Sequence, residues 1–243
     1  MRWSRPFKTT FVAGSIVTGL ALGASGVASS TDPYASGSTG YDVSYPQCPG
    51  TVAPAGTFAI VGVNGGRPFT QNSCLSTEYA VAPKSPAPSL YINTGYSGAY
   101  RKSISTNCSS LSRGVSGTSQ EQQAWAIGCT EAEASLAYAS RQGATSVAMW
   151  WLDVETGNSW STSNLTLNQY TIQGAVTRMA HSGLPVGVYS TASMWNAITG
   201  GNFTPTGLAA DWVAAGSCST PFTKSPVWLV QSVVGGVDRD YAC

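Results

Sequence analysis

Charge is scarce in this chain. Only 9% of its 243 residues are Asp, Glu, Lys or Arg, and the formal net charge is +1. No basic patch stands out, so nucleic acid is not expected as a partner. The one histidine, His181, stands just before Gly183 where a helix is expected to end, which argues against a Ser-His-Asp triad. Without C-x-x-C pairs or further histidines, we expect no metal and no cofactor.

Long apolar runs are also missing beyond residue 28, so no later segment is expected to span a membrane. At the start of the chain, basic residues precede an uncharged apolar run, 9–28, that ends in small residues. This pattern predicts a secretory signal peptide over 1–28, with an N-terminal membrane anchor as the alternative. A Gly/Ser-rich flexible linker over 29–40 and one domain over 41–243 would follow. The expected product is an extracellular monomer, free or associated with the cell wall.

Six cysteines are present, all after the expected signal peptide. An even number in an exported chain indicates disulfides, and six cysteines allow fifteen connectivities. We favour pairing between nearest neighbours, because each bond would then tie down one loop or the chain end. The expected pairs are Cys48–Cys74, Cys108–Cys129 and Cys218–Cys243.

Strands and helices alternate along most of the chain. Short apolar runs predict strands over 40–42, 57–63, 89–93, 149–155, 184–189, 208–214 and 227–233. Helical spacing of apolar residues predicts helices over 72–82, 119–142, 164–182 and 193–198. The polar segment 96–117 reads as a long loop. Alternation of this kind indicates a parallel sheet, either open or closed into a barrel.

The predicted strand 149–155 ends in two carboxylates, Asp153 and Glu155. Alternate residues of a strand share a face, so both side chains point the same way, about 7 Å apart at the backbone. Burial and mutual repulsion are expected to raise at least one pKa. One protonated and one ionised carboxyl group is what cleavage of a glycosidic bond requires. Two solvated acids at a strand end are the alternative interpretation.

Several blocks in order resemble glycoside hydrolase family 25 (GH25), the lysozyme-type muramidases. The blocks are 41–44, which contains Asp-Val-Ser, 151–155, which contains Asp-Val-Glu, and then 187–190, 210–213, 228–231 and 236–238. The resemblance implies an α/β fold, an irregular TIM-like barrel of about five β/α units followed by strands. It also implies a peptidoglycan or related cell-envelope glycan as the substrate.

The resemblance assigns roles to single residues. It implies that Glu155 is the general acid, that Asp153 is the nucleophile or electrostatic stabiliser, and that Asp42 and Asp238 complete the acidic groove. Tyr189 and Trp212 occupy positions that line the sugar groove in the family. Two further polar residues, Asn93 and Gln231, are expected at strand ends, where barrel active sites lie, and are therefore substrate-binding candidates.

The chain also departs from the family pattern. The family often has an acidic residue after the second strand, where this chain has Asn64, and a tryptophan soon after Ser44, where it has Tyr45. Two hypotheses follow. The first is a secreted glycoside hydrolase that cleaves the β-1,4 bonds of N-acetylmuramic acid. The second is a non-catalytic or weakly active glycan-binding barrel of the DUF1906 kind. A chitinase-like enzyme is disfavoured because its D-x-x-D-x-D-x-E motif is absent.

Overall fold

The computed structural model describes residues 30–48 and 55–243, and the predicted signal peptide lies outside them. Eight strands in this part of the chain form a closed barrel in sequence order. Neighbouring strands from β1 to β7 are parallel, whereas β8 runs antiparallel to both β7 and β1. The strands are β1 (Thr39–Val43), β2 (Ala59–Gly62), β3 (Ser89–Asn93), β4 (Trp150–Asp153), β5 (Val186–Ser190), β6 (Ala210–Ala214), β7 (Val227–Val234) and β8 (Val237–Ala242).

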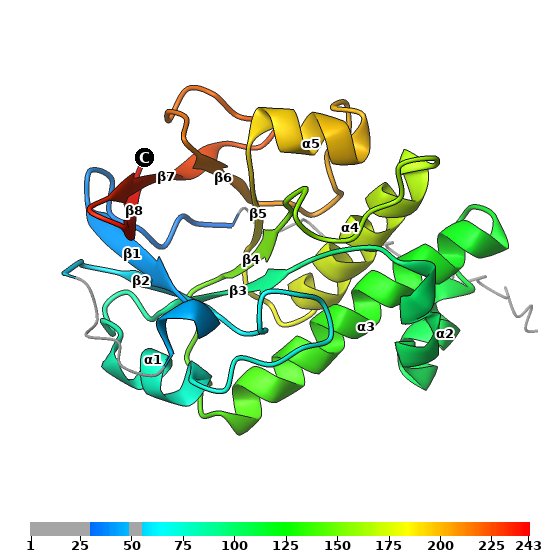
Figure 1. Ribbon diagram of the computed structural model, residues 1–243, viewed down its shortest axis with the longest axis horizontal. Helices are drawn as coiled ribbons and strands as arrows, with labels where there is room; N and C mark the ends of the chain where they lie inside the picture. The colour runs from blue at the N-terminus through cyan, green and yellow to red at the C-terminus, as the bar shows by residue number, and fades with distance from the viewer. Residues whose placement is uncertain (1–29, 49–54) are drawn as a thin grey trace, which may run out of the picture.

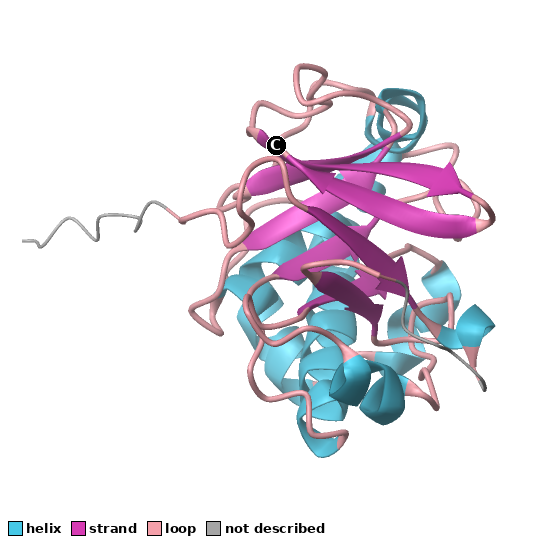
Figure 2. Cartoon of the chain, turned by 90° about the vertical axis from the view of Figure 1, so that its left-hand side faces the viewer, coloured by secondary structure: helices cyan, strands magenta, loops and turns pink. Residues whose placement is uncertain are grey.

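The helices follow the strands and gather mainly along one side of the barrel (Figure 1; Figure 2). They are α1 (Leu75–Val81), α2 (Thr106–Ser112), α3 (Ser119–Arg141), α4 (Leu165–Ala180) and α5 (Ala192–Thr199), with 3-10 turns η1 (Tyr45–Gln47) and η2 (Gly98–Ser103). After α5 the helices give way to strands, so the predicted irregular TIM-like barrel is confirmed. No helix of the described chain has the length and apolar character needed to cross a membrane.

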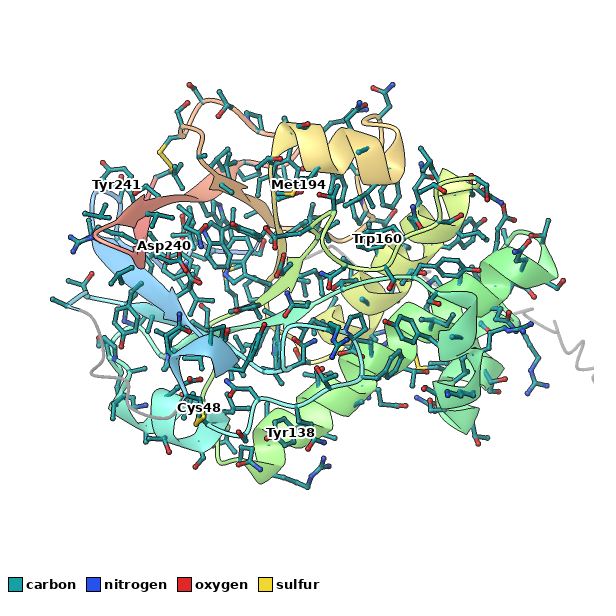
Figure 3. All side chains as sticks on the ribbon, in the orientation of Figure 1. Cys48, Tyr138, Trp160, Met194, Asp240 and Tyr241 are labelled. Atoms are coloured by element: carbon teal, nitrogen blue, oxygen red, sulfur yellow. A yellow bond between two sulfur atoms is a disulfide. The ribbon has the colours of Figure 1, made fainter. Side chains whose placement is uncertain are left out.

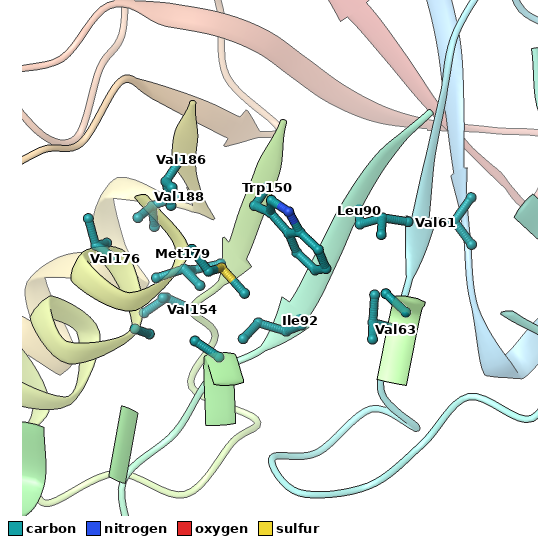
Figure 4. Packing of buried hydrophobic residues seen from close by; sticks show 14 of the residues in the cluster. Val61, Val63, Leu90, Ile92, Trp150, Val154, Val176, Met179, Val186 and Val188 are labelled. Atoms are coloured by element: carbon teal, nitrogen blue, oxygen red, sulfur yellow. The ribbon is translucent and has the colours of Figure 1, made fainter. Parts of the chain in front are cut away.

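Side chains alternate between two separate cores. The outward residues of β2 to β5 pack against the helices, as Figure 4 shows for Trp150, Val186 and Val188 beside Val176 and Met179 of α4. The inward residues form a second cluster inside the barrel, which includes Phe58, Ile60, Trp151, Trp212 and Leu229. These side chains fill the lower level of the barrel interior, toward the amino ends of the parallel strands. Only the upper level, at the carboxyl ends, is left for polar groups.

Inward glycines make room for the large rings of the barrel interior. A Cβ on Gly187 of β5 would lie 2.1 Å from the ring of Trp151, and one on Gly62 of β2 would lie 2.8 Å from the ring of Tyr91. Both distances are shorter than any van der Waals contact. Tyr34, from the segment before β1, lies below these rings, with its hydroxyl hydrogen-bonded to Ser89 and to the indole N–H of Trp151.

Three expectations about local structure need correction. Part of the expected flexible linker packs on the barrel: Tyr34 is buried, and the backbone N–H of Gly37 donates to Ala242. The expected loop 96–117 contains η2 and α2, because Ser105 caps α2 and the Cys108–Cys129 bond joins α2 to α3.

Strand β8 was not expected at all. Its outer face is exposed, and one of its two buried residues is an acid, Asp240. The usual alternation of buried apolar and exposed polar residues is therefore absent. The disulfide pairing, in contrast, is confirmed for all three pairs, Cys48–Cys74, Cys108–Cys129 and Cys218–Cys243. The last pair connects the end of the chain, just after β8, to the loop that follows β6.

Helices α3 and α4 approach each other closely where two glycines face the partner backbone. A Cβ on Gly128 would lie 1.8 Å from the backbone oxygen of Thr171, and one on Gly174 would lie 2.0 Å from that of Trp125. The hydroxyl of Thr171 also donates to the backbone oxygen of Ala124. Two backbones cannot yield locally, so this contact determines how the helix pair lies against the barrel.

Replacement of Gly128 by alanine therefore tests the helix contact. We expect Gly128→Ala to lower the free energy of unfolding by at least about 2 kcal/mol, although alanine is otherwise the better helix former. Urea unfolding followed by circular dichroism measures the change. Gly98→Ala is the matched control, since a Cβ there meets no atom within 4 Å. Equal stability of the two variants would contradict the close contact.

Candidate active site

The polar groups of the barrel interior lie at the carboxyl ends of the parallel strands. Asp42 stands near the end of β1, Asn93 and Asp153 end β3 and β4, and Gln231 lies in the second half of β7. Because β8 is antiparallel, its first residues reach the same end, and Asp238 pairs with Val233. This is the end at which barrel enzymes place their active sites.

Two adjoining cavities of about 310 and 240 Å³ open at this end. They share the four acids that the sequence analysis singled out, together with Tyr91. Asn93 lines the larger cavity, beside Tyr45, Gly157 and Asn158. Tyr189, Trp212 and Gln231 line the smaller one. All eight site residues expected from the sequence therefore border one acidic cleft.

Asp153 forms the buried base of the cleft. It is only 6% exposed, and one carboxylate oxygen, Oδ2, accepts a hydrogen bond from the side-chain amide of Asn93. The other oxygen, Oδ1, is buried without a partner in the described chain. Burial raises the pKa of Asp153 well above its usual range, and the charges of Glu155 and Asp42 raise it further.

Glu155 lies two residues beyond Asp153, just past the end of β4, and is half-buried. The indole N–H of Trp160 donates to its backbone oxygen at 2.8 Å, which anchors the turn that carries it. Burial raises the pKa of Glu155, followed by the charge of Asp238. Asp153 was expected to raise the pKa of Glu155, but the charge that raises it is that of Asp238. Of the two carboxyl groups, Asp153 has the more strongly raised pKa.

A chain of hydrogen bonds connects three strands across the smaller cavity. The hydroxyl of Tyr189 donates to Oε1 of Gln231 at 2.6 Å, and Nε2 of Gln231 donates to Oδ2 of Asp42 at 2.7 Å. Burial and the charge of Asp238 raise the pKa of Asp42 to about 7, although the bond from Gln231 opposes the shift. Tyr189 and Gln231 therefore orient an acid in addition to lining the cleft.

Trp212 contributes mainly to packing. Its side chain is 2% exposed and its ring lies edge-on to Trp151 and Tyr189, with centroids 5.6 and 4.6 Å away. Little of the indole surface is left for a ligand, although the residue borders the smaller cavity. Trp150 and Trp151, on opposite faces of β4, are both buried.

Two residues of the site were missed or misjudged from the sequence. Tyr91 borders both cavities, and its place on the face of Asn93, two residues earlier on the same strand, was the available signal. No catalytic or binding role was expected for Asp240, which is fully buried beside Asp42. Asp211, outside the expected site, is structural: its carboxylate accepts from the backbone N–H groups of Phe222 and Thr223.

Another buried acid, Glu131, supports the cleft from behind. Glu131 of α3 accepts from the side chain of Asn64 at 3.2 Å and from the backbone of Phe69 at 2.5 Å. Asn64 also exchanges hydrogen bonds with the backbone of Asn93, which holds Asp153. Glu131 thus reaches, from a helix, the region after β2 where the sequence lacks the expected acid. Burial raises its pKa to about 7.

The acids of the described chain are not arranged as metal ligands. Within residues 30–48 and 55–243, no group of three or more histidine, cysteine or carboxylate side chains is placed to hold a metal ion. The arrangement suits proton transfer, because several carboxyl groups with raised pKa values face one cavity.

Three solved structures share the fold of this chain. One is a family GH25 lysozyme from Aspergillus fumigatus, 15% identical, with a TM-score of 0.54 over 85% of this chain and 94% of that one. Another is the modular autolysin LytC from Streptococcus pneumoniae, 12% identical, with a TM-score of 0.51 over 84% of this chain and 46% of that one. At identities this low, the structural likeness shows a common fold and no more.

The spore cortex lytic enzyme SleM from Clostridium perfringens has the same fold, at 11% identity and a TM-score of 0.51, over 85% of this chain and 67% of that one. A family model described as Lys-1, lysozyme-like protein 1, matches residues 91–213, about half of the chain. The chain belongs to this lysozyme-like family. No curated protein matches it in sequence. The predicted likeness to GH25 is thereby confirmed at the level of the fold.

The raised pKa values predict how stability depends on pH. The carboxyls of Asp42 and Glu131 have pKa values of about 7 in the folded protein, against about 4 in an unfolded chain. Between pH 4 and 7 the folded state binds more protons than the unfolded state. The free energy of unfolding should therefore fall as pH rises through this window.

Urea unfolding at pH 5 and pH 8, with the disulfides intact, measures this dependence. Glu131→Gln removes one of the groups and should make the decrease smaller, whereas Glu133→Gln, at a site 26% exposed on the same helix, should not. A free energy of unfolding that rises between pH 5 and 8 would contradict the raised pKa values.

Proposed function

We propose that the protein is a secreted glycoside hydrolase that cleaves the β-1,4 bonds of N-acetylmuramic acid in peptidoglycan. The observation that carries the proposal is that Asp42, Asp153, Glu155 and Asp238 border one cleft of sufficient size for sugar rings. Membership in a lysozyme-like family and the fold of GH25 lysozymes support it. One of the solved neighbours, LytC, is described in complex with a synthetic peptidoglycan ligand.

Glu155 is the proposed general acid. It is the half-buried member of the Asp153–Glu155 pair, so its carboxyl group can reach the oxygen of a bound glycosidic bond. Its raised pKa keeps a proton available for the leaving group at mildly acidic pH. Asp238, on the other side of the cleft, contributes to that shift, because two like charges facing each other favour protonation of one.

Asp153 is the proposed electrostatic stabiliser or nucleophile. Its pKa is raised in the free protein, but positive charge that develops on a bound sugar ring favours its ionised form. Asn93 holds one of its oxygens, so the carboxyl group has a defined orientation. Asp42, oriented by Gln231 and Tyr189, helps to hold the substrate.

Other parts of the cleft fit a glycan. Tyr45 is 48% exposed and borders the larger cavity, so its ring offers an apolar surface to a sugar face. Asn158 supplies an amide on the opposite wall. Export is supported by three disulfides, which persist in oxidising compartments.

The second candidate is a barrel that binds cell-envelope glycans without cleaving them. One observation favours it: Asn64 replaces the acidic residue expected after the second strand, and it is fully buried and engaged with Glu131 and Asn93. The cleft would then retain its shape for a glycan while lacking one acid.

Hydrolysis by purified protein distinguishes the two candidates. We expect purified cell walls to lose turbidity and to release fragments whose new reducing ends are muramic acid, identified by mass spectrometry after borohydride reduction. Glu155→Gln should lower the rate at least about 100-fold, the usual contribution of a general acid, with unchanged folding.

Glu133→Gln is the matched control, because it makes the same chemical change on α3, where the side chain contacts Ser105, Asn107 and Arg178 and lies outside the cleft. It should retain the parent rate. Wall binding without release of fragments by the parent protein would reject hydrolysis in favour of the second candidate. A fully active Glu155→Gln variant would reject the assignment of the general acid.

A further inference from the structure

Asp240 is the most enclosed acid at the cleft. It lies on β8, opposite Gly40 of β1 and Gln231 of β7, and none of its surface is exposed. Figure 3 labels it among the strands, whereas its neighbour Tyr241 lies at the outer edge. A carboxyl group with no access to water must find its partners within the protein, or carry a proton.

The two oxygens of Asp240 have different surroundings. Oδ1 accepts a hydrogen bond from the indole N–H of Trp212 at 2.9 Å. Oδ2 is buried and receives no hydrogen bond from any donor in the described residues. The carboxyl of Asp42 lies within hydrogen-bonding reach of Asp240. Two carboxyl groups can form such a bond only if one of them is protonated.

The surroundings of Asp42 indicate which of the two holds the proton. Its Oδ2 already accepts an N–H from Gln231, and the hydroxyl of Tyr189, donating to the other end of the same amide, fixes the orientation of that amide. Asp42 therefore has a donor that favours its ionised form. Asp240 has an oxygen, Oδ2, for which a proton is the available way to form a hydrogen bond.

We propose, resting on the function proposed above, that Asp240 is a positioning residue that stays protonated and donates its proton as a hydrogen bond from Oδ2 to Asp42. This bond favours the ionised form of Asp42 and orients it at the cleft that it shares with Asp153 and Glu155. The indole of Trp212 supports the arrangement from below, because its N–H occupies Oδ1 and leaves Oδ2 for the proton.

The electrostatics of the surrounding groups agree with this assignment. The titratable groups that act on Asp240 are Asp42 of β1 and Asp238 of its own strand, and the charge of Asp240 acts in turn on the hydroxyl of Tyr34 below. Burial raises the pKa of Asp240 well above its usual range, and the charge of Asp42 raises it further. The hydrogen bond from Asp240 in turn lowers the pKa of Asp42, against the effects of burial and Asp238.

Two replacements of Asp240 separate the hydrogen bond from mere packing. Asp240→Asn keeps a donor, because its amide N–H can replace the carboxyl O–H. Asp240→Leu has a similar size but no donor. Loss of a hydrogen bond to a charged group corresponds to about one to two pKa units, so Asp42 should titrate that much higher in the leucine variant. In the asparagine variant it should titrate within about half a unit of the parent.

Carbon-13 NMR of aspartate-labelled protein reads these titrations without substrate, with Asp42→Asn and Asp240→Asn assigning the two signals. In the parent we expect the Asp240 signal to stay in its protonated form while Asp42 ionises. Asp211→Asn is the control for a buried aspartate elsewhere, and should leave the Asp42 titration unchanged. The acid limb of the wall-hydrolysis pH profile should shift upward with Asp240→Leu and be restored with Asp240→Asn.

Two results would overturn the proposal: an Asp240 that ionises before Asp42 in the parent protein, or an Asp42 titration that is the same with leucine as with asparagine at position 240. The first is read on the parent alone, so it holds even if the leucine variant does not fold. If the parent titrates as expected but cleaves no wall, the proposed function fails while the acid pair stands.

Discussion

Repulsion among carboxyl groups at the mouth of the barrel is the constraint on which this structure depends. Asp42, Asp153 and Asp240 are buried within the strands, and Glu155 and Asp238 face them across the cleft. Burial and like charge both disfavour their ionised forms. The surrounding fold has enough stability to hold these groups together. Their proximity and burial raise their pKa values, which suits the carboxyl groups to proton transfer.

The lower level of the barrel supplies that stability. Trp151, Trp212 and Phe58 fill the interior below the acids, and Tyr34 lies beneath them. Glycines on the inner face leave the space that these rings occupy. The same rings also orient the polar groups above, since Trp212 donates to Asp240 and packs edge-on against Tyr189. Packing and chemistry are thus coupled through a few aromatic side chains.

Helix α3 connects the outer layer to the cleft. Its Gly128 allows close contact with α4, Cys129 joins it to α2, and Glu131, two residues further on, bonds to Asn64 and Phe69. Asn64 in turn holds the backbone of Asn93, the partner of Asp153. A polar network inside a protein has defined geometry only when its members are satisfied, and here a helix behind the sheet satisfies them.

Much of this protein was determined by local sequence patterns. Apolar runs and helical spacing predicted seven strands and the four main helices, because burial on both faces of a strand and on one face of a helix leaves a periodic signature. Spacing of two residues placed Asp153 and Glu155 on one side, and strand ends located Asn93 and Gln231. The even number of cysteines after an expected signal peptide indicated disulfides, and their order along the chain suggested the pairing.

Only the tertiary structure decided the rest. Strand β8 has no apolar face to reveal it, because its inward positions meet Asp42 and Gln231 and carry Asp240. The partners of a buried acid come from strands far apart in sequence, as Gln231 and Asp42 do, so no local pattern could show which side chain orients which acid. The sequence specified the residue types at each strand end, whereas closure of the barrel determined which of them meet.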